Sequence, residues 1–188
     1  ILSLIRDPSG KCPPVVDKIG ALIHNTGEIP STQLNQAENS MTPPSQLTAE
    51  EKAKLDAFLG ERLLAHLATA NPKTNQPHVV PVWYLWDGEC IWIHAYAKFR
   101  KSRELAANPR CAVAISDDRG GLPLAAAMLE GQAELIYEPR QFVHDQAERI
   151  YQRYMRPEEI LAPDPQSWLN DPEIGLIKIT PRQVYLLS

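Results

Sequence analysis

The chain has 188 residues, of which 44% are hydrophobic and 22% are charged. These values are typical of soluble globular proteins that bury a hydrophobic core without needing disulfides or structural metals. Its net charge of −4 argues against a protein that binds nucleic acid through phosphates, because such proteins carry a basic surplus. No stretch approaches the roughly 20 apolar residues that a membrane span needs, so we expect no membrane partner.

The three cysteines, Cys12, Cys90 and Cys111, are far apart in the sequence. This spacing gives neither a disulfide framework nor a zinc motif. The first residues also lack the basic start and long apolar run of a secretory signal. We therefore expect reduced thiols, no metal site and a cytoplasmic location.

Residues 1–40 differ from the rest of the chain. They contain Pro13-Pro14 and scattered small polar residues, with no sustained hydrophobic period. We predict that residues 1–40 form an N-terminal extension outside the domain and that the domain covers residues 41–188.

The first clear element of the domain is a short helix. Thr48 and Glu51 have the spacing of a capping box, in which each side chain satisfies an amide of the first turn. Leu55, Phe58 and Leu59 follow at helical spacing, and the pattern ends at residue 60.

A run of strands follows. Strands are expected at residues 63–69, 78–86, 89–95, 110–116, 124–137, 175–180 and 183–187, with helices at 98–108 and 139–155. Asp87-Gly88 indicates a two-residue hairpin turn. Pro81 lacks an amide hydrogen, so it predicts a sheet edge, a bulge or a ligand contact. The absence of strand–helix–strand alternation favours a small antiparallel barrel or sandwich with added helices.

Three motifs give the domain a resemblance to a known family. They lie at residues 67–83, 100–110 and 130–134, in this order. The arrangement resembles the FMN-binding split barrels of the pyridoxamine 5'-phosphate oxidase-like family. The resemblance implies a mainly β (α+β) fold, an antiparallel split β-barrel with flanking helices.

The resemblance also implies which residues bind FMN. The backbone of the second strand would lie along the isoalloxazine ring, and Arg100 and Lys101 would hold the phosphate, since arginine and helix amides form a natural anion site. His94 stands near the phosphate or the ribityl chain, and Trp168 could cap the ring from a partner subunit. The complete set of expected cofactor-binding residues is Val80, Pro81, Val82, His94, Lys98, Arg100, Lys101, Gln132 and Trp168.

The expected function is that of an FMN-dependent oxidoreductase with a small-molecule substrate. We assign no catalytic side chain, because a flavin performs hydride and electron transfer itself. The true oxidases carry a further arginine and histidine late in the chain, whereas Arg182 is the only late arginine here. Vitamin B6 oxidation is therefore not the activity we expect.

Two alternatives share the same scaffold. The first is a reductase that uses a deazaflavin coenzyme, and the second is a protein that binds flavin or haem without turnover, with His94 or His144 as an axial haem ligand. The resemblance further implies a homodimer with the cofactor at the subunit interface. Four tryptophans and six tyrosines are consistent with such an interface.

Overall fold

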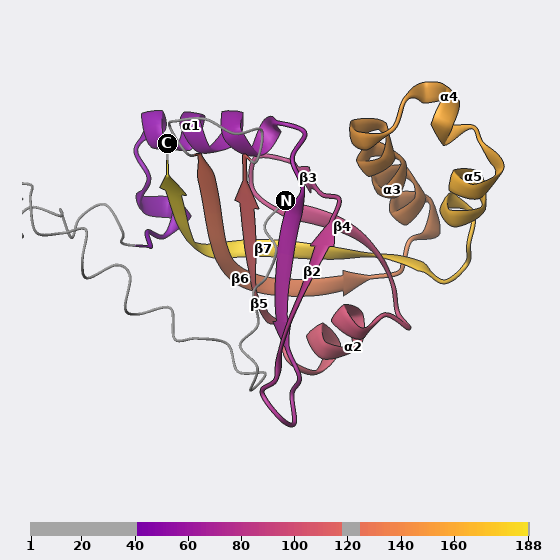
Figure 1. Ribbon diagram of the computed structural model, residues 1–188, viewed down its shortest axis with the longest axis horizontal. Coiled ribbons are helices and arrows are strands. Elements are labelled where there is room, and N and C mark those ends of the chain that lie inside the picture. The colour runs from indigo at the N-terminus through magenta and orange to yellow at the C-terminus, as the bar shows by residue number, and fades with distance from the viewer. Residues whose placement is uncertain (1–40, 118–124, 188) are drawn as a thin grey trace, which may run out of the picture. The chain divides into compact units, whose positions relative to one another are not determined.

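The computed structural model describes residues 41–117 and 125–187. The predicted N-terminal extension at residues 1–40 therefore lies outside the described residues. The described chain forms a seven-stranded sheet that curls into a split barrel, flanked by helices (Figure 1). The strands are β1 (Ala65–Ala70), β2 (Pro77–Val82), β3 (Leu85–Trp86), β4 (Ile91–Tyr96), β5 (Arg110–Ser116), β6 (Ala126–Ile136) and β7 (Ile174–Leu187).

The strands follow the order β2-β1-β5-β6-β7-β4-β3, and every neighbouring pair is antiparallel. β2 therefore stands at one edge of the sheet. Pro81 lies on this edge strand opposite His66 of β1, which is where a residue without an amide hydrogen is tolerated. The edge predicted from Pro81 is confirmed.

The helices are η3 (Pro44–Gln46), α1 (Ala49–Gly60), α2 (Arg100–Ala107), α3 (Arg140–Tyr154), α4 (Pro157–Ile160) and α5 (Pro163–Leu169). The capping box at the start of α1 is confirmed, because the Thr48 hydroxyl accepts from the Glu51 amide and the Glu51 carboxylate accepts from the Thr48 amide. None of the helices in the described part of the chain has the length and apolar run that a bilayer crossing needs.

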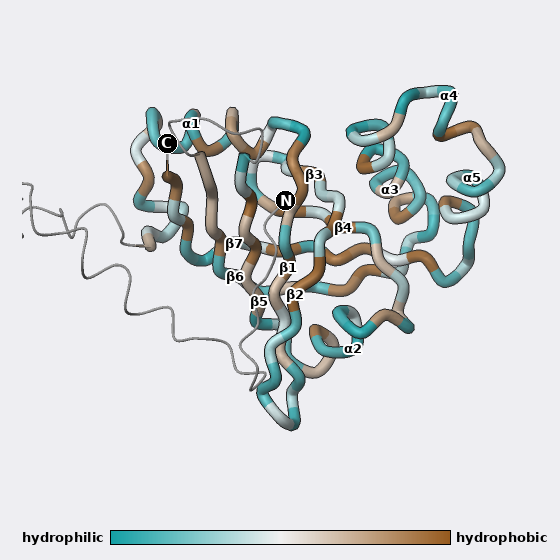
Figure 2. Tube along the Cα trace, viewed as in Figure 1, coloured by the Kyte–Doolittle hydropathy of each residue, from teal (hydrophilic) through white to brown (hydrophobic). Residues whose placement is uncertain are grey.

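The inside of the barrel holds the larger of two hydrophobic cores. Alternate residues of the strands point inward, as Ile91, Ile93 and Ala95 do from β4. α1 contributes Leu55 and Leu59 to the same core. Figure 2 shows hydrophobic residues along these strands and a hydrophilic tip on the β1–β2 hairpin.

A second core lies on the outer face of β4 and β7. There α3 packs Val143, Ala147 and Ile150 against residues such as Trp92 and Leu176. Figure 1 shows α3, α4 and α5 grouped together beside this part of the sheet. The outer face of β4 is thus covered by helices, and this covering creates the surroundings of His94 and Tyr96.

The C-terminal part of the sheet differs from its prediction. Two separate strands were expected at residues 175–180 and 183–187, whereas β7 is one strand of 14 residues that continues through Pro181. The register of the pairing between β6 and β7 shifts between Glu130 and Gly131, beside Pro181. Gly131 is required there, because a Cβ atom would collide with the Thr180 backbone oxygen.

Candidate functional site

A pocket of about 420 Å³ opens where the end of β2 meets β4 and α2. Its volume falls within the range of about 300–1,000 Å³ that is usual for small-molecule sites. The pocket is lined by Leu64, Pro81, Val82, Trp83, His94 and Lys101. Most of the lining is apolar, and one cation and one imidazole supply the polar groups.

Four residues that the sequence predicted as cofactor contacts meet in this pocket, namely Pro81, Val82, His94 and Lys101. They come from three elements that are separate in the sequence. The prediction did not include Leu64 and Trp83, which also line the pocket. Trp83 directly follows Val82 and is the last residue of the motif at residues 67–83, so extending the expected ring contacts by one residue would have included it.

Side chains along β2 point alternately to its two faces, and this decides which of them reach the pocket. Val80 and Val82 pack against the barrel core, whereas Pro81 lies on the exposed side of the strand. Val82 is both a core residue and part of the pocket wall, because it stands at the end of the strand. Val80 does not line the pocket.

Lys101 is the cation of the pocket. Its side chain is partly buried, and this burial lowers the pKa of the ammonium below its ordinary value. Among the described residues Lys101 has no carboxylate partner, and its Nζ lies 4.6 Å from the centre of the Phe99 ring. An anion bound in the pocket would compensate the charge that the protein leaves unpaired.

His94 lies on the outer face of β4, and its two ring nitrogens differ. Nδ1 is 3.1 Å from the Tyr151 hydroxyl oxygen. Nε2 is buried and has no hydrogen-bond partner among the described residues. Burial, reinforced by the charge of Lys101 and opposed by Asp171, lowers the pKa of His94 to about 4, so the imidazole is neutral at neutral pH.

Trp83 forms the aromatic side of the pocket, and two tyrosines of α3 hold it. Its ring stacks on Tyr154 with centroids 5.1 Å apart and meets Tyr151 edge-on at 6.0 Å. The Tyr154 hydroxyl donates to the Leu63 carbonyl at 2.7 Å and accepts from the Tyr84 amide at 3.2 Å. These contacts fix Trp83 through groups that are themselves anchored to the barrel.

Arg100 lies beside a different pocket. Its Nε donates to Glu104 Oε1 at 2.8 Å. The guanidinium lines a cavity of about 490 Å³ together with Lys73 and Arg103. The structure therefore separates Arg100 from Lys101, which the sequence had assigned to a single phosphate group.

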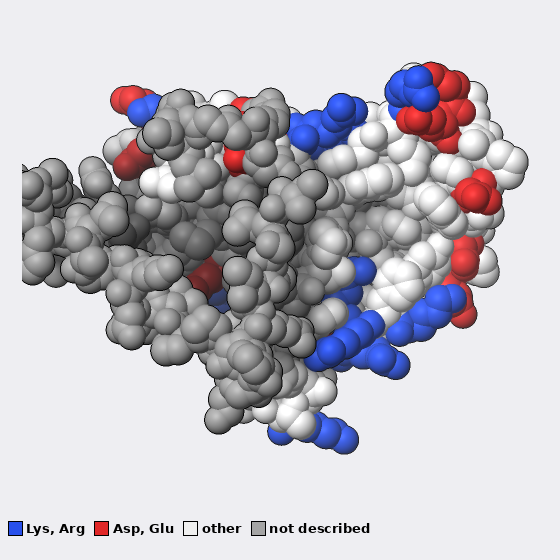
Figure 3. Space-filling model, viewed as in Figure 1, with Lys and Arg blue, Asp and Glu red and all other residues white. Residues whose placement is uncertain are grey.

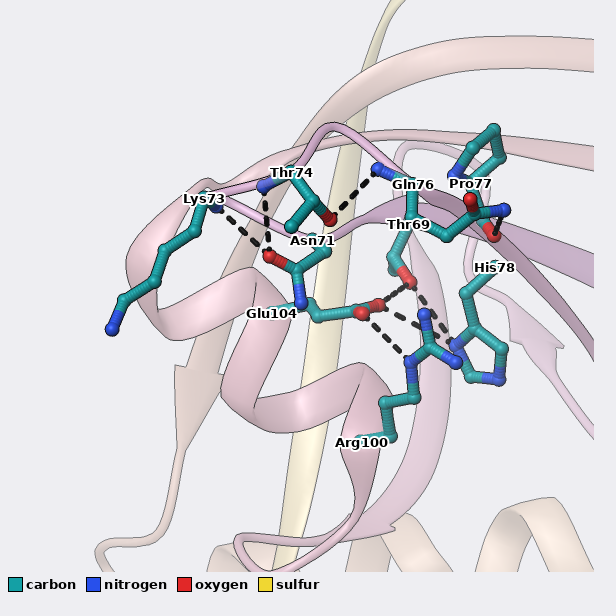
Figure 4. Close-up of polar contacts among 9 residues, drawn as sticks. All are labelled: Thr69, Asn71, Lys73, Thr74, Gln76, Pro77, His78, Arg100 and Glu104. Atoms are coloured by element: carbon teal, nitrogen blue, oxygen red, sulfur yellow. Dashed lines mark hydrogen bonds and ion pairs between the residues drawn. The ribbon is translucent and has the colours of Figure 1, made fainter.

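Glu104 holds Arg100 in this position through a buried cluster (Figure 4). Its carboxylate is only 5% exposed, accepts from the Thr69 hydroxyl at 2.5 Å, and lies 3.4 Å from His78 Nδ1. Burial by itself would raise the pKa of Glu104, but the hydrogen bonds from Thr69 and Arg100 and the charges of Arg100 and His78 lower it overall. The carboxylate is thus an ionised anchor that joins α2 to the β1–β2 hairpin.

Three other predicted residues lie outside the pocket. Lys98 forms an ion pair with Glu173 at 2.8 Å. Gln132 accepts a hydrogen bond from Arg182 and lines a separate cavity. Trp168 of α5 is 41% exposed and meets Tyr151 edge-on.

Basic and acidic side chains gather on different parts of the surface (Figure 3). Figure 3 shows Lys and Arg side chains gathered in the region of α2, whereas acidic side chains gather around α4 and α5. The cations on and before α2 are Lys98, Arg100, Lys101 and Arg103. A positive potential at this end of the barrel favours an anionic ligand.

Residues 51–188 match the family model described as pyridoxamine 5'-phosphate oxidase. This match covers most of the chain, so the chain belongs to that family. A search of curated protein sequences gave no match.

Solved structures show the same fold. A conserved hypothetical protein from Mycobacterium tuberculosis is 27% identical, with a TM-score of 0.62 over 76% of this chain and 86% of that chain. A protein described as F420 reductase is 25% identical, with a TM-score of 0.56 over 69% of this chain and 94% of that chain. A haem storage protein from Vibrio cholerae is 16% identical, with a TM-score of 0.58 over 71% of this chain and 92% of that chain, and this likeness concerns the fold alone.

Proposed function

We propose that the chain binds FMN in the pocket between β2, β4 and α2 and acts as an FMN-dependent oxidoreductase on a small-molecule substrate. One observation carries this proposal: a partly buried lysine that has no carboxylate partner among the described residues lies in the same pocket as a wall of apolar and aromatic residues. A phosphorylated ring system needs both features, a flat apolar surface for the ring and a cation for the phosphate.

The residues of the pocket have distinct roles in this proposal. Pro81, Val82 and Trp83 form the wall for the ring, and Lys101 binds the phosphate. The bound flavin would supply the hydride and electron transfer, and the protein orients it and limits the access of water. Membership of the family and the buried Nε2 of His94, which lacks a partner in the described residues, are consistent with a polar ligand at this place.

Arg100 has a secondary role in the proposal. Its guanidinium is 47% exposed and engaged with Glu104, so it acts on the phosphate through its charge from the neighbouring cavity. Its contact with Glu104 uses Nε, so the N–H groups of the two terminal nitrogens can donate to an anion in that cavity without breaking this contact.

The protein would act as a homodimer. Gln132 and Trp168 do not line the pocket of their own subunit, and in this arrangement they would approach the cofactor from the partner subunit. Trp168 has the exposure that such a contact needs.

A second candidate is a reductase that uses a deazaflavin coenzyme of the F420 type. The observation in its favour is the 25% identity to a protein described as F420 reductase, which spans 94% of that chain. A deazaflavin ring would pack on the same apolar wall, and its phosphate would bind the same Lys101.

The absorption spectrum of the freshly purified full chain tests both candidates. A flavin spectrum, or saturable binding of added FMN, supports the first, and preferential binding of F420 supports the second. An intense haem band, with no affinity for either flavin, would overturn both. Heat release and mass identification of any chromophore make the assignment direct.

A further inference from the structure

Three aromatic side chains form a row from the pocket to the surface of the subunit. Trp83 lines the pocket, and its ring meets the Tyr151 ring edge-on with centroids 6.0 Å apart. Tyr151 in turn meets Trp168 edge-on at 6.3 Å. Trp168 is 41% exposed, whereas Tyr151 is only 1% exposed. Electrons pass readily between aromatic rings that are in contact at such separations, so this aromatic row connects an oxidant in the pocket with the surface.

The middle ring of the aromatic row has a proton acceptor beside its hydroxyl. An oxidised phenol is a far stronger acid than a neutral one, so a buried tyrosine gives up an electron where its proton can leave at the same time. The Tyr151 hydroxyl oxygen is 3.1 Å from His94 Nδ1, which is within reach for proton transfer. Burial raises the pKa of Tyr151 and lowers that of His94 to about 4, so the pair starts as a neutral hydroxyl and a neutral imidazole.

The proton of the neutral imidazole can be placed by accounting for donors and acceptors. If Nδ1 of His94 carried the proton, the Tyr151 hydrogen would have no acceptor in the described chain, and the buried Nε2 would keep an unsatisfied lone pair. With the proton on Nε2, the Nε2 hydrogen is the one group of the pair left without a partner there. This arrangement leaves fewer buried groups unsatisfied, and it makes Nδ1 an acceptor.

Tyr154 lies closer to Trp83 than Tyr151 does, but it has no comparable acceptor. Its ring stacks on Trp83 with centroids 5.1 Å apart. Its hydroxyl donates to the Leu63 carbonyl and accepts from the Tyr84 amide. A carbonyl oxygen is a much weaker base than an imidazole nitrogen. Of the two tyrosines that hold Trp83, Tyr151 is therefore the one whose proton has a base to receive it.

We propose that Tyr151 is a redox-active tyrosine, which relays single electrons from Trp168 to Trp83. His94 holds the phenolic proton during the transfer. The oxidant is taken from the proposed function and is a flavin in the pocket that is excited by light. Trp83 gives one electron to this oxidant, and Tyr151 replaces it as its O–H bond breaks and the proton moves to His94 Nδ1.

The second half of the relay restores the starting state. Trp168 gives one electron to Tyr151, and the proton returns from His94 to the phenol oxygen. A water-soluble one-electron reductant of the ascorbate class then reduces Trp168. In the proposed dimer the same ring borders the partner's pocket, which is open to small molecules as well. The net change is one electron moved from the reductant to the oxidant, and an oxidised Trp83 is repaired.

The surroundings of His94 favour the return of the proton. Burial and the charge of Lys101 disfavour the imidazolium, and Asp171 opposes their effect without reversing it. The Tyr96 ring that meets His94 edge-on carries a neutral hydroxyl, because burial and Asp171 raise its pKa. The imidazolium consequently releases its proton once Trp168 supplies an electron. This makes Tyr151 a relay and not a trap for the radical.

A light pulse on the FMN-loaded full chain tests the relay. We expect a tyrosyl radical in the transient absorption and electron paramagnetic resonance spectra, and ring-deuterated tyrosine should change its hyperfine pattern. Tyr151→Phe should abolish the tyrosyl signal and leave an indole radical. Tyr154→Phe is the matched control and should keep the signal, because it removes a hydroxyl of the same helix that bonds to a backbone carbonyl. A tyrosyl signal that persists in Tyr151→Phe would overturn the proposal.

Heavy water and ascorbate test the proton and the exit from the aromatic row. The tyrosyl radical should form more slowly in heavy water, because the proton moves with the electron. Ascorbate should accelerate its decay, and Trp168→Phe should lose this acceleration. Trp86→Phe is the control, since Trp86 lies outside the aromatic row and bonds to Asp56. Equal rates in the two solvents would contradict the role of His94, and an ascorbate effect that survives Trp168→Phe would contradict the exit.

Failure of the relay and failure of the proposed function give different results. If the chain bound no FMN, the flavin assignment would fail, and a soluble ruthenium photo-oxidant added to the ligand-free chain should still produce the radical at Tyr151. If the chain bound FMN and light gave no tyrosyl radical, the flavin assignment would stand and the redox role of Tyr151 would be wrong.

Discussion

Arg100 and Lys101 are consecutive residues, yet their side chains line different pockets. One step along an α-helix turns the side-chain direction by about 100°, so neighbours at the start of α2 face different elements. Lys101 is directed to the pocket beside β2 and β4. Arg100 is directed to Glu104, one helical turn further along the same face, and to the β1–β2 hairpin.

This division predicts unequal effects of two substitutions on FMN binding. Lys101→Ala should weaken FMN by about ten- to a hundredfold, because it removes the charged hydrogen bond to the phosphate. Arg100→Ala should have a smaller effect, and the double variant should be the weakest binder. Fluorescence titration measures these affinities, with Lys54→Ala as a control on the distant helix α1. A larger loss from Arg100→Ala would place the phosphate in the other cavity.

The buried carboxylate of Glu104 predicts an effect on stability. Glu104→Gln should lower the free energy of unfolding by about 1–3 kcal/mol, because Thr69 and Arg100 lose a charged acceptor. The exposed Glu89→Gln is the matched control and should change stability little. Chemical denaturation at neutral pH gives both values.

The pH dependence of the same variant has a defined sign. The pKa of Glu104 is below its ordinary value of 4.5 in the folded protein. Its contribution to stability is therefore present above pH 4.5 and is lost as the pH falls below that value, where the unfolded chain binds the proton first. The stability difference between wild type and Glu104→Gln should shrink over that interval, and a constant difference would contradict an ionised Glu104.

His94 predicts a second pH effect. Its pKa is lowered from 6.5 to about 4 on folding, so the unfolded chain is protonated between these values while the folded protein is not. Stability should consequently fall as the pH decreases from 7 to 5, by about 1–2 kcal/mol from this group. His94→Gln should remove that part of the pH dependence, whereas the exposed His66→Gln should keep it. Denaturation midpoints at the two pH values measure the effect.

Gly131 predicts a packing effect at the irregular part of β6. Gly131→Ala should destabilise the fold by about 1–3 kcal/mol, because its Cβ would collide with the backbone of Thr180 and Pro181. Gly60→Ala at the end of α1 is the matched control, since its Cβ meets no atom within 4 Å. Thermal unfolding should show a lower midpoint for Gly131→Ala alone, and equal midpoints would argue against the close approach of the two strands.

Local signals predicted much of the fold because they act within a few residues. Thr48 and Glu51 define the start of α1, and Asp87 accepts from the Glu89 and Cys90 amides at the predicted turn. Pro81 indicated an edge strand because its missing amide hydrogen excludes it from the middle of a sheet. β7 was divided in two for the same local reason, since Pro181 resembles a strand end when its partner strand is unknown.

The sequence by itself determined where most of the strands lie along the chain, the apolar second strand and the presence of cations at the start of α2. It did not determine the order of the strands in the sheet. The tertiary structure decided which cation faces which cavity, and it brought Tyr151 to His94 from a helix that follows two strands later in the sequence. Such contacts depend on how helices pack on a curved sheet. Spacing along the chain carries no information about that packing, because each side chain's surroundings come from elements that are distant in sequence.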